Sequence, residues 1–177
     1  MADKKGEPKI LIDSDVIRHF IDGGKILEMH KIFPRRLVII DVVKEELCRS
    51  KKIKPIVLNF ISFCKIEEVD LDDNYEALME YAKLIKTVGE GEAACMALAK
   101  VENKYIASSN LSDIKEYCIE NGIKIITTMD FLYEALMNQL YTDEECDKFI
   151  NDVLVKGNRL PTRSIAEYVK NFKMKKK

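Results

Sequence analysis

Four acidic residues stand at positions in the sequence from which their carboxylates can meet in one site. Asp13 ends the short apolar segment KILID, Glu46 lies in an amphipathic segment, Glu92 lies in the apolar segment GEGEAACMALAK, and Asp113 follows the segment YIA. Carboxylates that share one crevice repel one another and cannot all stay ionised without a cation. Hard oxygen ligands suit Mg²⁺ or Mn²⁺, and such an ion activates water for attack on a phosphodiester. The pattern predicts metal-dependent hydrolysis of nucleic acid.

Asp13 has an ordinary interpretation beside the chemical one. Aspartate favours turns and helix N-caps, and a helical segment is expected to begin directly after Asp13. In open parallel sheets, however, ligands bind at the carboxyl ends of the strands, where Asp13 is expected to lie. On this residue alone, both interpretations stay open.

Helix geometry separates Glu46 from its neighbour Glu45. At roughly 100° per residue, Val42, Val43 and Leu47 define an inward face, with Glu46 about 40° from its centre and Glu45 about 140° away. Glu46 is therefore expected to point inward, where a carboxylate is costly unless it is paired or bound to a cation. The alternative is a glutamate at the rim of the core that reaches water.

Glu92 shares one helical stripe with Cys95, Met96 and Ala99, and Glu90 is expected to precede the helix proper. The segment is nearly all small or apolar, so it is expected to pack centrally. A glutamate in a first helical turn is common because the helix dipole stabilises an anion. Its place on an otherwise apolar stripe favours a functional role.

The loop after residues 105–107 can bring Ser109, Asn110 and Asp113 to the crevice of Asp13. Ser109 or Asn110 is also suited to cap the next helix, whether or not it has a further role. Asp130, after a later strand, is either a helix cap or an outer carboxylate of the site.

The elements that must position these residues alternate along the chain. Strands are expected at residues 9–13, 36–40, 65–70, 105–107 and 123–127. Helices are expected at residues 14–20, 25–32, 42–49, 53–63, 74–86, 91–102 and 111–121, and then at 131–140, 142–155 and 164–172. This alternation predicts an α/β fold with a central parallel sheet and helices on both faces. Residues 1–140 are expected to form the domain, and residues 141–177 a C-terminal helical extension with a basic tail.

Composition narrows the class of protein. Charged residues make up 33% and hydrophobic residues 47% of the 177 residues, which is typical of one folded domain. The net charge of -1 gives no overall basic footprint for nucleic acid. The five cysteines are expected to be reduced, and without a CxxC motif or closely spaced histidines a zinc site is not expected. No apolar run is long enough to span a bilayer and the N-terminus is polar, so a cytoplasmic protein without membrane partners is expected.

Four segments together resemble the PIN-domain family. They are ILIDSD (residues 10–15), VIIDVVKEEL (38–47), GEGEAACMALA (89–99) and IASSNLSDI (106–114), in the order found in the family. The glycine-flanked GEGEA before an alanine-rich helix is similar to a branch of small, stand-alone prokaryotic members. The resemblance covers about residues 9–140.

The resemblance implies a three-layer domain that binds Mg²⁺ or Mn²⁺ and cleaves RNA. By position, Asp13, Glu46 and Glu92 resemble the first three acids of the family, and Ser14 resembles a hydroxyl that supports the site. A homodimer is implied as well, as is a role as the toxin of a toxin–antitoxin pair with an antitoxin protein as partner.

The fourth acidic position departs from the family pattern. Where many members have an aspartate just after the strand, this chain has Ser109 and Asn110, with Asp113 one helical turn further on. Asn110 can offer a carbonyl oxygen to a metal beside Asp13 and Glu92, but it brings no charge and so weakens metal affinity. Ser109 is expected to support the site.

Two other functions fit the same residues. The first is a PIN-like module that binds nucleic acid or protein through a degenerate site. The second is a phosphatase of the haloacid-dehalogenase type, because Asp13-Ser14-Asp15 also resembles the DxD of that family, whose first aspartate is a nucleophile. Ile17, where that family has a small β-branched residue, and the lack of a later GDxxxD-like pair argue against it.

Overall fold

The structure is a computed structural model that describes residues 6–175. Residues 1–5 and 176–177 lie outside the described residues, so the first part of the polar N-terminus and the end of the basic tail are not discussed. Among the described residues, no helix has both the length and the apolar character needed to cross a membrane. All five cysteines are free thiols, and four of them are buried.

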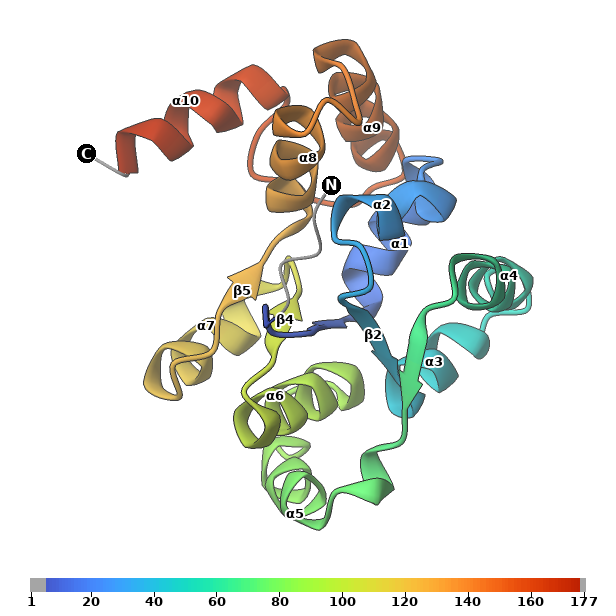
Figure 1. Ribbon diagram of the computed structural model, residues 1–177, viewed down its shortest axis with the longest axis vertical. Coiled ribbons are helices and arrows are strands. Elements are labelled where there is room, and N and C mark those ends of the chain that lie inside the picture. The colour runs from blue at the N-terminus through green and yellow to red at the C-terminus, as the bar shows by residue number, and fades with distance from the viewer. Residues whose placement is uncertain (1–5, 176–177) are drawn as a thin grey trace.

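The centre of the fold is a five-stranded, all-parallel sheet (Figure 1). Its strands are β1 (Ile10–Ile12), β2 (Leu37–Ile40), β3 (Glu67–Val69), β4 (Tyr105–Ala107) and β5 (Ile125–Ile126), in the order β3-β2-β1-β4-β5. In the register, Leu11 pairs with Val38 on one side and Ile106 on the other. Every residue of β1 and β2 is buried, as expected for apolar strands covered on both faces.

Helices surround the sheet on both faces, which confirms the predicted α/β class. They are α1 (Ser14–Asp22), α2 (Met29–Ile32), α3 (Asp41–Cys48), α4 (Lys54–Cys64), α5 (Tyr75–Leu84), α6 (Glu90–Glu102), α7 (Leu111–Glu120), α8 (Thr128–Met137), α9 (Asp143–Val155) and α10 (Ile165–Lys175). Figure 1 shows α1, α2, α8 and α9 on one face and α5, α6 and α7 on the other, with α3 and α4 beside β2 and β3. The molecule therefore has three layers.

Some predicted boundaries are wrong for local reasons. The single helix predicted at residues 25–32 is a 3₁₀ turn (Ile26–Glu28) followed by the four-residue α2. Helix α8 begins at Thr128, earlier than predicted, because Thr127 and Asp130 form a capping box. Helix α6 includes Glu90 as its first residue, whereas the sequence placed Glu90 before the helix.

The C-terminal helices share the core of the domain. Phe149 of α9 is buried against Phe20 of α1, with ring centroids 5.0 Å apart in an edge-on arrangement. Gly23, directly after α1, faces the Phe149 ring so closely that any larger residue would collide with it. Helix α9 of the predicted C-terminal extension therefore packs into the same hydrophobic core as α1.

Candidate metal site at the carboxyl edge of the sheet

The predicted acids gather where the strand order of the sheet reverses. From β1 the chain proceeds to β2 on one side, while β4 occupies the other side and leads on to β5. Asp13 directly follows β1, and its backbone N–H donates to the carbonyl of Ala107 at the end of β4 (2.9 Å). Such a reversal opens a crevice at the carboxyl edge of a parallel sheet, which is the usual place for a ligand.

Asp13 is both a helix cap and a buried acid. Its carboxylate accepts a hydrogen bond from the backbone N–H of Ser14 (2.7 Å), and the residue is only 1% exposed. Burial raises the pKa of the Asp13 carboxyl well above its ordinary value, and the charges of Asp15 and Glu92 raise it further. Hydrogen bonds from Ser14 and Ser108 oppose that rise. The structure therefore joins the two interpretations that the sequence left open.

Asp15 is the acid that the sequence analysis did not place in the site. Its carboxylate accepts hydrogen bonds from the backbone N–H groups of Ser109 (2.7 Å) and Val16 (2.6 Å). Burial raises the pKa of Asp15 to about 6, with the charge of Glu92 as a smaller contribution, while these hydrogen bonds lower it. The signal in the sequence was the triplet Asp13-Ser14-Asp15, which was considered only for a phosphatase.

Glu46 lies on the opposite side of Asp13 from β4. The Ser14 hydroxyl donates to Glu46 Oε1 (2.8 Å), and the Arg18 guanidinium lies 3.8 Å from the same oxygen. The Glu46 side chain is 27% exposed, whereas Glu45 is exposed on the outer side of α3. Glu46 thus faces the crevice from its rim, held by the hydroxyl that the resemblance assigned to a supporting role.

Gly91 lets α6 approach the acids closely. A Cβ at this position would lie 2.8 Å from Glu46 Oε2, 3.2 Å from Asp13 Oδ1 and 3.5 Å from Val43 Cγ2. Real Cβ atoms essentially never come within 3.0 Å of another heavy atom, so a side chain here would displace a carboxylate. The glycine of the GEGEA segment therefore places the backbone of α6 against two of the predicted acids.

Glu92 and Asn110 connect α6 with the loop after β4. The amide nitrogen of Asn110 donates to Glu92 Oε1 (3.1 Å) and to Asp113 Oδ2 (2.8 Å), while its carbonyl oxygen accepts from Ser112 (2.8 Å). Asn110 holds the N-cap position of α7, but its side chain makes no capping hydrogen bond. In this arrangement Asn110 bridges two carboxylates as a donor, and the carbonyl oxygen predicted to bind metal is directed at Ser112. Asp113 is exposed at the outer end of the group.

Ser109 supports the site through a buried chain of hydrogen bonds. Its hydroxyl donates to Thr128 Oγ1 (2.9 Å) and accepts from the Thr128 backbone N–H (3.0 Å). His19 Nδ1 lies 2.8 Å from the same Thr128 oxygen, and burial lowers the pKa of His19. The Ser109 side chain thus fixes the loop to α8 rather than capping α7. This fixes the N–H that Ser109 offers to Asp15.

Cys95 marks the position that the four acids have in common. Burial raises the pKa of its thiol well above the ordinary value, and the charges of Asp13, Asp15, Glu92 and Glu46 all add to the rise. All four carboxylates therefore lie within electrostatic reach of the buried Cys95 thiol on α6. We refer to Asp13, Asp15, Glu46 and Glu92 below as the acidic cluster.

The acidic cluster has the donor chemistry of a site for a hard cation. Its ligand atoms are all carboxylate oxygens, Asp13 is buried with a raised pKa, and Gly91 lets α6 approach it without a side chain between them. Over residues 6–175, no three His, Cys, Asp or Glu side chains are already grouped so as to hold a metal ion. Glu46 is turned toward Ser14 and Glu92 toward Asn110, so coordination requires these two flexible side chains to rotate.

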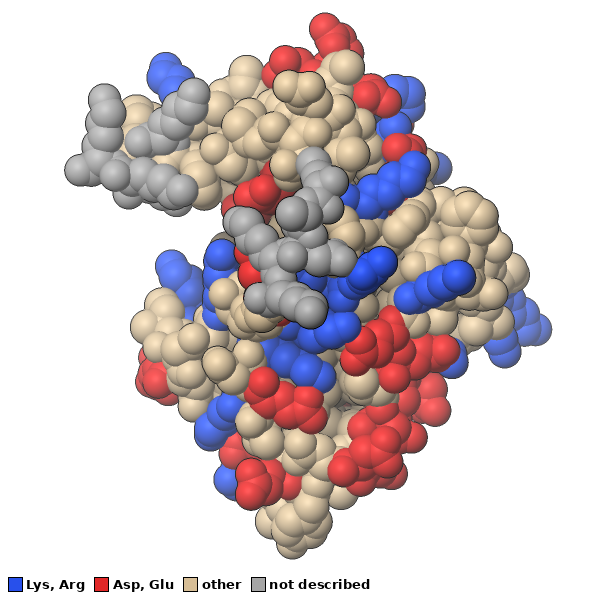
Figure 2. Space-filling view, in the orientation of Figure 1, with Lys and Arg blue, Asp and Glu red and all other residues tan. Residues whose placement is uncertain are grey.

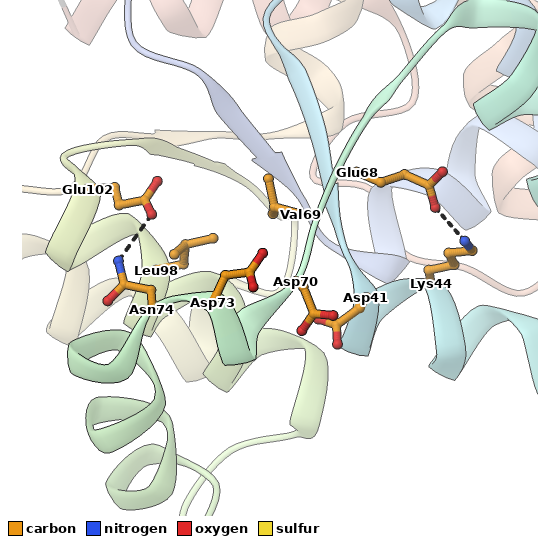
Figure 3. Close-up of a pocket in the computed structure, with 9 residues that line it drawn as sticks. All are labelled: Asp41, Lys44, Glu68, Val69, Asp70, Asp73, Asn74, Leu98 and Glu102. Carbon is orange, nitrogen blue, oxygen red and sulfur yellow. Dashed lines mark hydrogen bonds and ion pairs between the residues drawn. The ribbon is translucent and has the colours of Figure 1, made fainter.

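A pocket of about 550 Å³ opens at the carboxyl ends of β2 and β3 (Figure 3). Asp41, Glu68, Asp70, Asp73 and Glu102 line it, with Lys44 as the cation, and Lys44 pairs with Glu68. Asp41, the first residue of α3, accepts a hydrogen bond from the Leu71 N–H (3.1 Å), and α3 has no side-chain cap. None of the acidic cluster lines this pocket, and its excess of carboxylates disfavours an anionic ligand.

Asp130 is a cap. Its carboxylate accepts hydrogen bonds from the Thr127 backbone N–H (2.7 Å) and hydroxyl (2.8 Å), and from the Tyr168 hydroxyl of α10 (2.7 Å). These bonds fasten the start of α8 to the C-terminal helix. Of the two roles considered for Asp130, helix cap and outer carboxylate of the site, the structure shows the helix cap.

No protein-family model matches the chain, and no curated protein matches it. The functional assignment therefore depends on the residues of the crevice.

Proposed function

We propose that the protein is a metal-dependent ribonuclease of the PIN type, with its active site at the acidic cluster. One observation carries the proposal: Asp13 is buried at the switch point of the sheet, and Asp15 and Glu92 lie close enough to raise its pKa. Such a group of acids is electrostatically unfavourable alone and becomes favourable when a divalent cation binds.

Each residue of the crevice has a distinct role in this proposal. Asp13, Asp15 and Glu92 would hold Mg²⁺ or Mn²⁺, with Glu46 completing the set from the rim. The bound ion would orient water and stabilise the charge on the phosphate during hydrolysis. Ser14 orients Glu46, and the N–H of Ser109 orients Asp15. Asn110 donates a hydrogen bond to Glu92 and another to Asp113, and so offsets the repulsion between the two carboxylates.

The test is cleavage of a fluorescent single-stranded RNA with Mn²⁺ or Mg²⁺, repeated in EDTA. We expect EDTA-sensitive cleavage by the wild type, loss of cleavage in Asp13→Asn and Glu92→Gln, and retention in Glu90→Gln. Glu90 is the matched control, because it lies on the same helix but is exposed and pairs with Arg49. Normal cleavage by both Asp13→Asn and Glu92→Gln would place the site elsewhere. Hydrolysis of a small phosphate ester without RNA cleavage would favour the phosphatase.

A second candidate is a binding module with a degenerate site. The absence of a preassembled metal group within residues 6–175 favours it, as does the uncharged Asn110 at the fourth acidic position. This candidate is distinguished by RNA binding without cleavage at any metal concentration.

The family resemblance extends the proposal to partners. A cytoplasmic toxin with an antitoxin protein as partner, acting as a homodimer, fits a small chain of this kind. Exposed apolar side chains such as Phe63 (66%) and Leu58 (41%) on α4 offer a surface that a protein partner would cover. A short neighbouring open reading frame and a dimer mass in solution are the observations that test this extension.

A further inference from the structure

The amino edge of the sheet is basic, opposite in charge to the carboxyl edge. A lysine or arginine precedes each of the five strands, and two further cations lie before β2, one in helix α2 and one in the turn that follows it. We call this set the basic edge; it comprises Lys9, Lys31, Arg35, Arg36, Lys65, Lys104 and Lys124. In Figure 2, lysine and arginine side chains gather over the middle of the molecule, with acidic side chains below and to the lower right.

The cations of the basic edge come from separate segments but lie together. Because parallel strands all begin at the same edge, the residues before them become neighbours. Burial raises the pKa of the Cys64 thiol, and the charge of Lys31 opposes that rise. Lys31 therefore lies near Cys64 and its neighbour in sequence, Lys65. Lys9, Arg36 and Lys104 pair with Glu67, Glu7 and Glu102. Lys31, Lys65 and Lys124 are exposed, so the edge keeps an excess of positive charge.

Aromatic rings hold two of these cations in place. The Arg36 guanidinium lies 5.6 Å from the Tyr105 ring centroid and 5.4 Å from that of Phe33, and Lys124 Nζ lies 5.1 Å from that of Tyr105. Arg36 also donates to the Pro8 carbonyl (3.0 Å). Cations fixed in this way lose little freedom when they bind a phosphate. Basic residues interleaved with aromatic rings are typical of surfaces that bind single strands.

Two cations occupy backbone positions that favour glycine or asparagine. Arg35 has φ = 57° and Lys65 has φ = 51°, each in the turn that leads into a strand. A left-handed backbone is unfavourable for residues with long side chains, and such outliers are a reason to ask about function. Both turns therefore contain a positively charged residue although their backbone conformation favours glycine or asparagine.

We infer that the basic edge binds the phosphate backbone of single-stranded RNA, the substrate class taken from the proposed function. The carboxyl edge is acidic and repels phosphates, so the protein needs a separate surface to hold a polyanion. Lys9 and Asp13 are four residues apart along β1, which corresponds to about 13 Å in a strand. Because β1 is buried, an RNA that contacts both edges must pass around the outside of the domain, and a strand of about 20 nucleotides is long enough to do so.

The test measures binding without cleavage. The probe is a fluorescein-labelled 20-nucleotide oligouridine, titrated in EDTA with full-length protein carrying Asp13→Asn, and followed by fluorescence anisotropy at several salt concentrations. The edge variant is Lys65→Glu with Lys124→Glu. The control is Lys52→Glu with Lys156→Glu, which changes the net charge equally at exposed lysines outside the edge. Circular dichroism confirms that all variants are folded.

We expect the edge variant to bind about tenfold more weakly than the control variant, with a salt slope smaller by about 1.4, because each phosphate contact on a single strand contributes about 0.7. Equal affinities for the two variants would overturn the inference and leave the basic edge to an acidic protein partner. If the wild type binds RNA through this edge but does not cleave it, the nuclease proposal is wrong and the inference about the basic edge stands. The two failures are therefore distinguishable.

Discussion

Gly91 faces Glu46 so closely that a methyl group on Gly91 would lie 2.8 Å from Glu46 Oε2. This contact joins α6 to α3 directly above Asp13, and it explains why the first turn of an alanine-rich helix contains a residue with poor helix propensity. The close approach brings Glu92 of α6 within electrostatic reach of Asp13 and Asp15.

The first prediction concerns Gly91→Ala. Alanine favours the helix by about 1 kcal/mol over glycine, so helix content should be kept or increased. Its Cβ, however, must displace Glu46 or Asp13, and we expect Mn²⁺ affinity to fall roughly tenfold or more, equivalent to about 1.4 kcal/mol. Calorimetry measures the affinity, and circular dichroism measures the fold.

Gly89→Ala is the companion variant. Its Cβ meets only the end of the flexible Glu92 side chain, which can turn away. We expect a smaller loss of affinity than in Gly91→Ala. The same affinity in Gly91→Ala as in the wild type would show that the contact with Glu46 has no part in metal binding.

A second prediction is the pH dependence of stability without metal. Burial raises the pKa of Asp15 from 3.8 to about 6, so the folded state binds more protons than the unfolded state across that interval. The protonated carboxyl contributes its full stability below the unfolded-state pKa, and this contribution is lost as pH rises through the folded-state pKa. For this shift in pKa, the loss in the free energy of unfolding amounts to about 3 kcal/mol. In EDTA, Asp15→Asn should therefore stabilise the protein at about pH 8 and change little at about pH 4.

The difference between wild type and Asp15→Asn isolates this effect from His19, whose lowered pKa acts in the opposite direction. Saturating Mn²⁺ should remove the advantage of the variant at high pH, because the wild-type carboxylate then has a cation. Thermal melts across pH provide the measurement. An Asp15→Asn variant less stable than wild type at high pH in EDTA would contradict the account.

A third prediction addresses the uncharged position in the loop after β4. Asn110→Asp replaces a donor to Glu92 and Asp113 with a third carboxylate. We expect lower stability in EDTA because of the repulsion, and tighter Mn²⁺ binding because the site gains a charged ligand. Asn59→Asp on the exposed side of α4 adds the same charge and should change neither. Unchanged metal affinity in Asn110→Asp would separate this loop from the site.

A fourth prediction concerns the Ser109 hydroxyl. Ser109→Ala removes its hydrogen bonds with Thr128 and should cost about 1 kcal/mol in urea unfolding. Since the Ser109 backbone N–H orients Asp15, RNA cleavage should fall as well. Ser62→Ala, at an exposed position of α4 away from the site, is the control. If both variants behave alike in stability and cleavage, the chain from Ser109 through Thr128 to His19 does not support the site.

The parallel sheet could be predicted because its strands carry strong local patterns. Leu37 to Ile40 form a continuous apolar run, and Asp13 ends another, so the strands and their carboxyl edge followed directly. The start of α8 was missed because residues 123–127 were assigned to a strand, although the spacing of Thr127 and Asp130 is that of a capping box. The 3₁₀ turn at Ile26–Glu28 was hidden by a pattern that also suits an α-helix.

The site was predicted less completely than the fold. Asp15 was not assigned to it, because in the sequence it is only the second residue of a helix, and its burial depends on the N–H of Ser109 from a distant loop. Asn110 was expected to offer its carbonyl oxygen, but the hydrogen bonds of a side-chain amide are decided by neighbours such as Glu92 and Asp113. Residue patterns predict the helix face on which a side chain lies. Its hydrogen-bond partners depend on how a distant loop packs, which these patterns do not reveal.

The most direct test of the central claim is a calorimetric titration of the metal-free protein with Mn²⁺. We predict saturable binding by the wild type, loss of binding in Asp13→Asn, and unchanged binding in Glu90→Gln, whose carboxylate pairs with Arg49 outside the cluster. A wild type that takes up no Mn²⁺ at millimolar concentration, or an Asp13→Asn variant that binds as well as the wild type, would contradict the assignment of the acidic cluster as a metal site.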